Sequence, residues 1–272
     1  MRVEVNFVPR LVSDVEAKVC VVIDALRATS TLVVLIERGV REVVVCGTLA
    51  EARRVARRTG YLLCGEVNSL PPPDFDYGNS PTEFAALDLG GRSAVLYTSN
   101  GTRALRRVAG AQTVLTGTLL NRRAAAGAAL AEAAQTQTET QAGVARVARV
   151  AGDRLAAGAD RDIAIVCAGR GHGRYFSLED AYAAGALVDS LLEQARAAGL
   201  RPRLWNDALA ALRLYRSYRG QALACFRQAD HGRSLIDLGL GHDLEFCART
   251  DVSTAVPRLR RGEDGLLCVV AG

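Results

Sequence analysis

The fold is decided by the stretch Val19-Cys20-Val21-Val22-Ile23-Asp24-Ala25-Leu26-Arg27-Ala28-Thr29-Ser30-Thr31. Its first five residues are apolar, and because such a run is too short for a separate helix, it predicts a buried strand. The strand ends at Asp24. A second apolar run then continues to Glu37-Arg38-Gly39, where the glycine indicates the end of a helix. The stretch therefore predicts a strand that ends at an acid and a helix that begins with a cation and hydroxyl groups.

This strand–helix turn has two interpretations. Ligands of parallel α/β sheets bind beyond the carboxyl ends of strands, and a helix N-terminus attracts anions. Asp24 then suits a metal ion, and the guanidinium of Arg27 suits a phosphate or carboxylate. The alternative is that Asp24 is a helix N-cap beside an ordinary surface arginine. The stretch alone leaves both interpretations open.

The strand–helix pattern repeats along the chain. Further strands are predicted at 2–7, 43–46, 61–64, 93–98, 112–115, 162–167 and 267–270, with helices after most of them. Such alternation implies parallel strands with right-handed crossovers. We therefore expect an α/β protein with three layers, α/β/α, around a largely parallel, mixed sheet.

Residues 1–272 are expected to form one domain. Helix starts are indicated where a hydroxyl residue precedes an acid by three positions, as at Thr48 and Ser177, and where Ser80 precedes a proline. The Gln- and Thr-rich residues at about 135–142 are expected to be a low-complexity insertion. Residues from about 205 to 237 are expected to be mostly helical.

The composition excludes several classes of protein. The net charge is +5, but the basic residues are scattered rather than clustered with aromatics, which disfavours nucleic-acid binding. No apolar run approaches the roughly 18 residues of a membrane span, and the first residues do not resemble a signal peptide. The seven cysteines lack CxxC spacing and suit reduced core positions, so we expect a cytoplasmic protein without a disulfide framework or structural zinc.

Several strand ends share one chemistry. Three combine a polar or glycine-containing turn with an arginine, and a fourth adds a carboxylate: Asp24 with Arg27, Asn100 with Arg103, Gly169 with Arg170, and Gly65 with Glu66. Carboxylates, arginines and glycine-loop amides at one sheet edge suit a divalent metal, Mg²⁺ in the first place, and a phosphorylated anionic substrate. No Walker A, GxSxG, HExxH or GxGxxG motif is present, and three histidines argue against a three-histidine metal site. His231 suits either a site residue or a helix cap.

At these residues the sequence resembles the 2-phosphosulfolactate phosphatase family. The matching blocks occur in family order over most of the chain: Ile23 to Thr31, Gly78 to Pro81, Thr98 to Thr102, Cys167 to Arg170, Phe176 to Asp180, and His231 to Arg233. The resemblance implies a magnesium-dependent phosphatase that acts on a sulfonated phospho-acid on the route to coenzyme M in methanogens. It also implies an α/β fold unlike the common phosphatase folds.

The expected site follows from the turns and the resemblance together. Asp24 and Arg27 are the expected catalytic residues, and the expected Mg²⁺ ligands are Asp24, Glu66, Glu179 and Asp180. The expected substrate-binding residues are Thr29, Ser30, Asn79, Asn100, Gly101, Thr102, Arg103, Gly169, Arg170 and His231. Arginine forks at positions 27, 103 and 170 suit phosphate, sulfonate and carboxylate better than lysine does.

The expected reaction is hydrolysis of the phosphate monoester of 2-phosphosulfolactate to sulfolactate and phosphate. Metal-bound water is the first choice of nucleophile, and an Asp24 phosphoenzyme is the second. The alternatives are a phosphatase of another small anionic phospho-acid and a non-catalytic protein that binds anionic metabolites. The expected partners are a small phosphorylated anion and, in a homo-oligomer, further copies of the chain; no nucleic acid and no membrane is expected.

Overall fold

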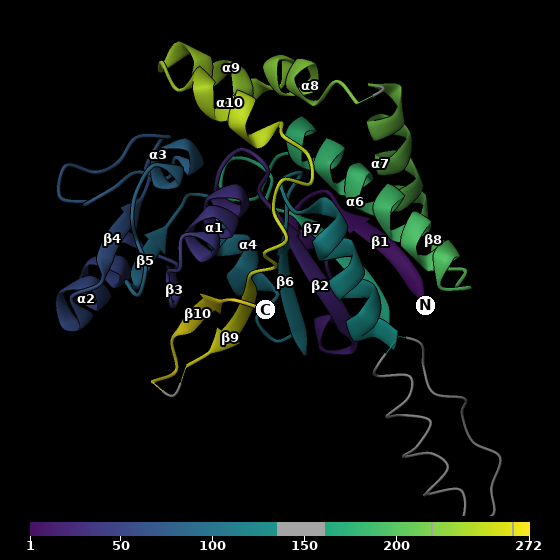
Figure 1. The fold of residues 1–272 in the computed structure, drawn as a ribbon, viewed down its shortest axis with the longest axis horizontal. Helices are drawn as coiled ribbons and strands as arrows, with labels where there is room; N and C mark the ends of the chain where they lie inside the picture. The colour runs from purple at the N-terminus through teal and green to yellow at the C-terminus, as the bar shows by residue number, and fades with distance from the viewer. Residues whose placement is uncertain (135–160, 219, 263) are drawn as a thin grey trace, which may run out of the picture.

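The computed structural model describes residues 1–134, 161–218, 220–262 and 264–272, and in this part of the chain ten strands form one sheet (Figure 1). The strand order is β4-β5-β3-β10-β9-β6-β2-β7-β1-β8. The predicted insertion at about 135–142 lies outside the described residues. The strands are β1 (Arg2–Asn6), β2 (Lys18–Ile23), β3 (Val43–Cys46), β4 (Leu62–Gly65), β5 (Ala94–Tyr97), β6 (Thr113–Gly117), β7 (Asp162–Cys167), β8 (Arg203–Leu204), β9 (Arg258–Arg261) and β10 (Leu267–Val270).

The sheet contains two groups of parallel strands. One group is β4-β5-β3, and the other is β6-β2-β7-β1-β8. Between them lies the hairpin of β9 and β10, which pairs antiparallel with itself, with β3 on one side and with β6 on the other. The expected largely parallel, mixed sheet is confirmed. The hairpin was not predicted, because the Arg-Leu-Arg-Arg of β9 carries no apolar run.

The helices follow the predicted capping signals. The Thr48 hydroxyl accepts a hydrogen bond from the N–H of Glu51, and Ser80 and Ser177 cap their helices in the same way. The expected helical segment near 205–237 contains three helices. The helices are α1 (Ala28–Glu37), α2 (Leu49–Thr59), α3 (Pro81–Ala85), α4 (Gly101–Arg107), α6 (Leu178–Ala197), α7 (Asn206–Ser217), α8 (Ala222–Gln228), α9 (Asp230–Asp237) and α10 (Gly241–Cys247), with short 3-10 turns at Pro9–Leu11 and Val15–Ala17. Residues 122–134 are also helical.

Strand β2 shows why helices cover both faces of the sheet. All six of its residues are buried. Val19, Val21 and Ile23 point to a core shared with α6 and α7, whereas Cys20 and Val22 point to a core shared with α1 and α4. Because side chains alternate along a strand, an uninterrupted apolar strand needs an apolar layer on each side. These two cores give the three-layer arrangement (Figure 1).

The cysteines belong to these cores. All seven are buried and unpaired in the structure. Burial raises the pKa of the Cys20 and Cys46 thiols to about 12, which leaves them protonated and unreactive. Within the described ranges, no helix has the length and hydropathy needed to span a membrane.

Candidate active site

A cavity of about 340 Å³ lies beyond the carboxyl ends of strands β2, β4, β5 and β7. Its volume is in the range of small-molecule sites. Strands β2 and β7 belong to one parallel group and β4 and β5 to the other, so the cavity lies between the two groups. Its polar lining includes Asp24, Arg27, Glu66, Asn100, Arg170 and His231.

Asp24 is held at the end of β2 by a closed turn. Its main-chain N–H donates to the Thr29 hydroxyl (3.0 Å), and the N–H of Thr29 donates to the Asp24 carbonyl oxygen (3.1 Å). The Thr29 hydroxyl also lies 3.0 Å from the carbonyl oxygen of Gly117 in β6. The N-cap of α1 is Arg27, so the alternative of an Asp24 cap is wrong. The turn fixes Asp24 while leaving its carboxylate toward the cavity.

Burial changes the acidity of this carboxyl group. The pKa of Asp24 is raised from 3.8 to about 7, mainly by desolvation and further by the negative charges of Glu66 and Glu179. His231 and Arg27 act in the opposite direction. Asp24 is therefore a carboxyl group whose ionised form lacks sufficient positive charge around it.

Arg27 is a buried guanidinium with an unusual backbone. Its φ is 140°, a region that L residues rarely adopt, and such a conformation costs on the order of 1–3 kcal/mol. The side chain is only 3% exposed and its Nη2 donates to the carbonyl oxygen of Ser69 (2.8 Å). Nη1 lies 3.7 Å from the Asp243 carboxylate, and Nε has no hydrogen-bond partner among the described residues. Free donors on a buried guanidinium suit an anionic ligand.

Two of the predicted metal ligands are already used by the main chain. Both carboxylate oxygens of Asp180 accept main-chain hydrogen bonds, one from Ala25 (2.8 Å) and one from Gly169 (3.0 Å). Burial nevertheless raises the pKa of Asp180 well above its usual value, with Asp24 adding to the effect. Through its two main-chain hydrogen bonds, Asp180 fixes the loops after β2 and β7.

Glu66 has the same role after β4. Its Oε1 accepts from the N–H of Ser99 (2.6 Å) and its Oε2 from the N–H of Ser69 (2.9 Å). Because Ser99 follows β5, Glu66 fixes the loops after β4 and β5 to each other. The carboxylate still reaches the cavity lining.

Glu179 differs from these two carboxylates. It is 1% exposed, its Oε1 lies 3.4 Å from Nδ1 of His231, and its Oε2 is buried without a hydrogen-bond partner in the described part of the chain. No group of three His, Cys, Asp or Glu side chains in the described ranges is arranged to hold a metal. Mg²⁺ however often uses one or two carboxylates, with water and phosphate as the other ligands. Asp24 lines the cavity and fits that mode. Glu179 is not among the lining residues, but its charge acts on Asp24 and its Oε2 has no partner among the described residues.

Cationic and amide side chains also line the cavity. Arg170 follows β7 and pairs with Asp230 on α9 (2.5 Å). His231 is the second residue of α9 rather than its cap, which is Ala229. The lining also contains Asn79, whose buried Oδ1 has no partner among the described residues, and Asn100, whose Oδ1 accepts from the N–H of His172 (2.9 Å).

Several predicted binding residues lie outside the cavity lining. Ser30 donates to the Ala25 carbonyl oxygen (2.9 Å), and Thr102 to that of Thr98 (2.9 Å), so these hydroxyls, like that of Thr29, stabilise turns. The N–H of Gly169 is occupied by Asp180, and Gly101 lies behind Asp24. Arg103 is exposed on α4 and is not brought to the cavity. The predicted clamp of three arginines is therefore reduced to Arg27 and Arg170.

Two residues of the site were not singled out from the sequence. His172 lines the cavity at φ 62°, and its Nδ1 lies 3.1 Å from the carbonyl oxygen of Ser99. Asp243 is fully buried beside Arg27 and comes from α10, far along the chain. The sequence carried no signal for Asp243, since a single acid near a helix start is ordinary. His172 stood in a glycine-rich turn after a strand, which was a usable signal.

Comparisons with known proteins show the family of the chain. A model of the 2-phosphosulpholactate phosphatase family matches residues 7–262. A protein of Thermotoga petrophila named probable 2-phosphosulfolactate phosphatase is 34% identical over 250 residues, which cover 92% of each chain. Proteins with the same name are 35% identical in Symbiobacterium thermophilum, over 93% of this chain and 96% of the relative, and 34% identical in Deinococcus radiodurans, over 100% of both.

Proposed function

The chain belongs to the 2-phosphosulfolactate phosphatase family, and we propose that it hydrolyses 2-phosphosulfolactate to sulfolactate and phosphate with the help of Mg²⁺. The relatives are phosphoric monoester hydrolases by name. One observation supports the same chemistry here: the buried carboxyl group of Asp24 and the buried guanidinium of Arg27 line one cavity of small-molecule size.

Arg27 is the proposed ligand of the phosphoryl group. Its charge is buried, one N–H is fixed by the Ser69 carbonyl oxygen, and Nε is left without a partner in the described residues. Hydrogen bonds from a guanidinium to phosphate oxygens are short and charge-assisted. Donors fixed before the reaction stabilise the charge that develops in the transition state.

Arg170 is the proposed ligand of the sulfonate or carboxylate. It lies on the loop after β7, at the side of the cavity formed by α9, and it is less buried than Arg27. Its present partner is Asp230, whose carboxylate also pairs with Arg233 (2.5 Å). A substrate anion can replace Asp230 at Arg170 while Asp230 stays paired with Arg233, so binding does not leave an isolated charge.

Asp24 and Glu179 are the proposed Mg²⁺ ligands. When bound, Mg²⁺ supplies positive charge that polarises a phosphoryl oxygen and lowers the repulsion between the substrate and these acids. The raised pKa of Asp24 and the unpaired Oε2 of Glu179 support this assignment: burial and neighbouring acids disfavour the ionised form of Asp24, and the Glu179 oxygen has no partner among the described residues. The side-chain oxygen of Asn79 has no partner among the described residues, and as an acceptor it suits the cation rather than an anionic oxygen.

Water is the proposed nucleophile, and Asp24 is the alternative. If Asp24 attacked phosphorus, an aspartyl phosphate would form and then be hydrolysed. Such an intermediate is stable in acid and is cleaved by hydroxylamine. Rapid acid quenching with labelled substrate should trap no phosphate on Asp24, and a hydroxylamine-sensitive label that is absent from Asp24→Asn would reverse the assignment.

Phosphate release from a panel of phospho-acids tests the proposed function. The panel pairs 2-phosphosulfolactate with phospholactate and phosphoglycerate, each with Mg²⁺ and with a chelator. We expect magnesium-dependent release and the highest kcat/KM for the sulfonated acid. A preference for another member would make the protein a phosphatase of a different phospho-acid, and binding without release would indicate a non-catalytic binding protein.

The proposed setting is the cytoplasm. Seven free, buried cysteines are typical of a reducing compartment. The proposed partners are the small phosphorylated anion and, in a homo-oligomer, other copies of the chain. Cell fractionation and light scattering test these two statements.

A further inference from the structure

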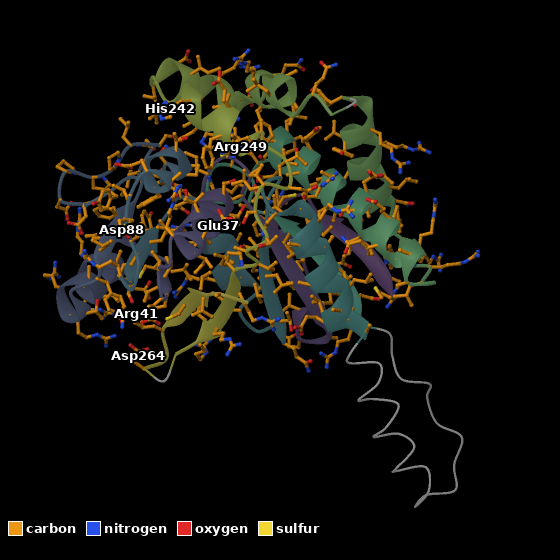
Figure 2. All side chains as sticks on the ribbon, viewed as in Figure 1. Glu37, Arg41, Asp88, His242, Arg249 and Asp264 are labelled. Atoms are coloured by element: carbon orange, nitrogen blue, oxygen red, sulfur yellow. The ribbon has the colours of Figure 1, made fainter. Side chains whose placement is uncertain are left out.

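A buried acid, Asp243, lies beside Arg27 and comes from a distant part of the sequence. Asp243 belongs to α10, next to His242, which Figure 2 labels on that helix. Its side chain is 0% exposed, although neither the turn motifs nor the family blocks include it. A fully buried carboxylate is costly unless hydrogen bonds and an opposite charge compensate it. Its position therefore requires a reason.

The two oxygens of Asp243 have different partners. Oδ1 accepts a hydrogen bond from the Ser80 hydroxyl (2.6 Å), and Ser80 in turn caps α3. Oδ2 has no hydrogen-bond partner among the described residues, and it lies 3.7 Å from Nη1 of Arg27. One oxygen thus fixes the carboxylate to α3, and the other directs its negative charge at the guanidinium.

The distance of 3.7 Å matters for the donors of Arg27. It is an ion-pair distance but too long for a hydrogen bond. Asp243 therefore attracts the guanidinium without using its N–H groups. Together with the hydrogen bond from Nη2 to the Ser69 carbonyl oxygen, this attraction fixes the plane of the guanidinium and leaves donors for a substrate.

We propose that Asp243 is a positioning residue for the reaction: its carboxylate, fixed by Ser80, orients the guanidinium of Arg27 toward the phosphoryl group. This inference rests on the proposed function, in which Arg27 binds phosphate. Through Asp243, helix α10 contributes to a site whose other residues come from the loops after the strands, from α9 and from the segment before α3. Asp243 does not touch the substrate.

A double-mutant cycle tests the inference. The proteins are the wild type, Asp243→Asn, Arg27→Lys and the double variant, and kcat/KM is measured for each. Asparagine keeps an acceptor for Ser80 and removes the charge. If Asp243 acts through Arg27, Asp243→Asn should lower kcat/KM about ten- to hundredfold in the wild type and less than about threefold beside Arg27→Lys. Equal losses in both backgrounds would overturn the proposal.

A second measurement does not require that the least active variant turns over substrate. The dissociation constant of inorganic phosphate, a product, is measured by calorimetry for the same four proteins. We expect the same non-additivity, with weaker binding after Asp243→Asn only where Arg27 is present. Should Asp243→Asn fail to fold, Asp243→Glu takes its place, since it keeps the charge but moves the carboxylate by one methylene group.

The matched control is Glu245→Gln on the same helix. Glu245 is exposed and pairs with Arg227 (3.3 Å), so the variant removes one charge from α10 without reaching Arg27. Its kcat/KM should equal that of the wild type, and a loss as large as that of Asp243→Asn would make the effect a property of α10 as a whole. A wild type without phosphate release would contradict the proposed function, whereas an active wild type with additive variants contradicts only the positioning role.

Discussion

Gly101 lies so close to Asp24 that a Cβ atom on the glycine would come within 2.7 Å of the aspartate Oδ2. The same atom would lie 2.5 Å from Cβ of Ala28. Gly101 begins α4 after β5, whereas Asp24 and Ala28 flank the turn after β2. The contact therefore joins the two parallel groups of the sheet directly behind the carboxylate.

Gly101→Ala tests this close approach. The added methyl group must displace Asp24, Ala28 or the start of α4, because distances below about 3 Å are not tolerated. We expect kcat/KM to fall at least about tenfold, or about 1.4 kcal/mol. Gly110→Ala is the control, since its added Cβ would lie 3.6 Å from its nearest neighbour, Oε1 of Glu16. An unchanged rate for Gly101→Ala would mean that Asp24 needs no fixed position.

Asp24→Asn should abolish turnover while the protein stays folded. Asparagine has nearly the same shape and keeps the main-chain turn with Thr29, but it lacks the negative charge that a hard cation needs. The measurement is phosphate release with Mg²⁺, together with a circular dichroism spectrum. Near-normal magnesium-dependent activity would show that the carboxylate has no part in the reaction.

The same variant should stabilise the protein without metal at neutral pH. The folded-state pKa of Asp24 is raised from 3.8 to about 7, so the unfolded chain loses this proton at lower pH than the folded protein. Stability therefore falls as the pH rises from about 4 to 7, by a few kcal/mol at most. Asp24→Asn removes this loss.

Thermal unfolding in chelator from pH 4 to 8 tests the predicted direction of this change in stability with pH. The Tm advantage of Asp24→Asn over the wild type should be absent near pH 4 and largest above pH 7. Asp237→Asn, the same change at an exposed position of α9, should show no such trend. An advantage that is constant with pH would contradict a raised pKa.

The turn after β2 was predicted well because neighbouring residues in the sequence determine it. Apolar residues 19–23 alternate between two cores, and the turn at Asp24 is closed by Thr29 five residues later. The predicted placement of side chains differs from the structure where contacts beyond the turn decide it. Arg103 follows a glycine turn, as Arg170 does, but the direction of α4 places it outside the cavity. Asp243 reaches the site only through packing of α10, which no local pattern encodes.

Arg170→Lys should reduce discrimination for the sulfonated acid. Lysine keeps the charge but loses the planar fork that binds two anion oxygens. Loss of such a contact costs about 1.5–3 kcal/mol, so kcat/KM for 2-phosphosulfolactate should fall roughly ten- to hundredfold. The value for phosphoglycolate, which has one anionic group fewer, should change much less. Equal losses of kcat/KM on both substrates would indicate that Arg170 binds the phosphate rather than the sulfonate.

Arg103→Lys is the comparison for that experiment. The sequence favoured a role in holding phosphate, which predicts a loss on both substrates. The exposed position of Arg103 on α4 predicts instead that both kcat/KM values stay within about twofold of the wild type. A large, equal loss would show that α4 or its neighbours move when substrate binds.

Removal of the metal should lower the Tm of the wild type but not that of Asp24→Asn. Mg²⁺ at about a hundred times its dissociation constant would stabilise the folded protein by about 2.7 kcal/mol. That gain requires Asp24, and Glu179→Gln should reduce it, because the buried Oε2 of Glu179 is the other proposed ligand. Thermal unfolding is compared in MgCl₂ and in chelator with NaCl at equal ionic strength, which separates a specific site from screening. The same Tm increase in Asp24→Asn would place the metal elsewhere, since the gain would then not depend on the carboxylate at the end of β2.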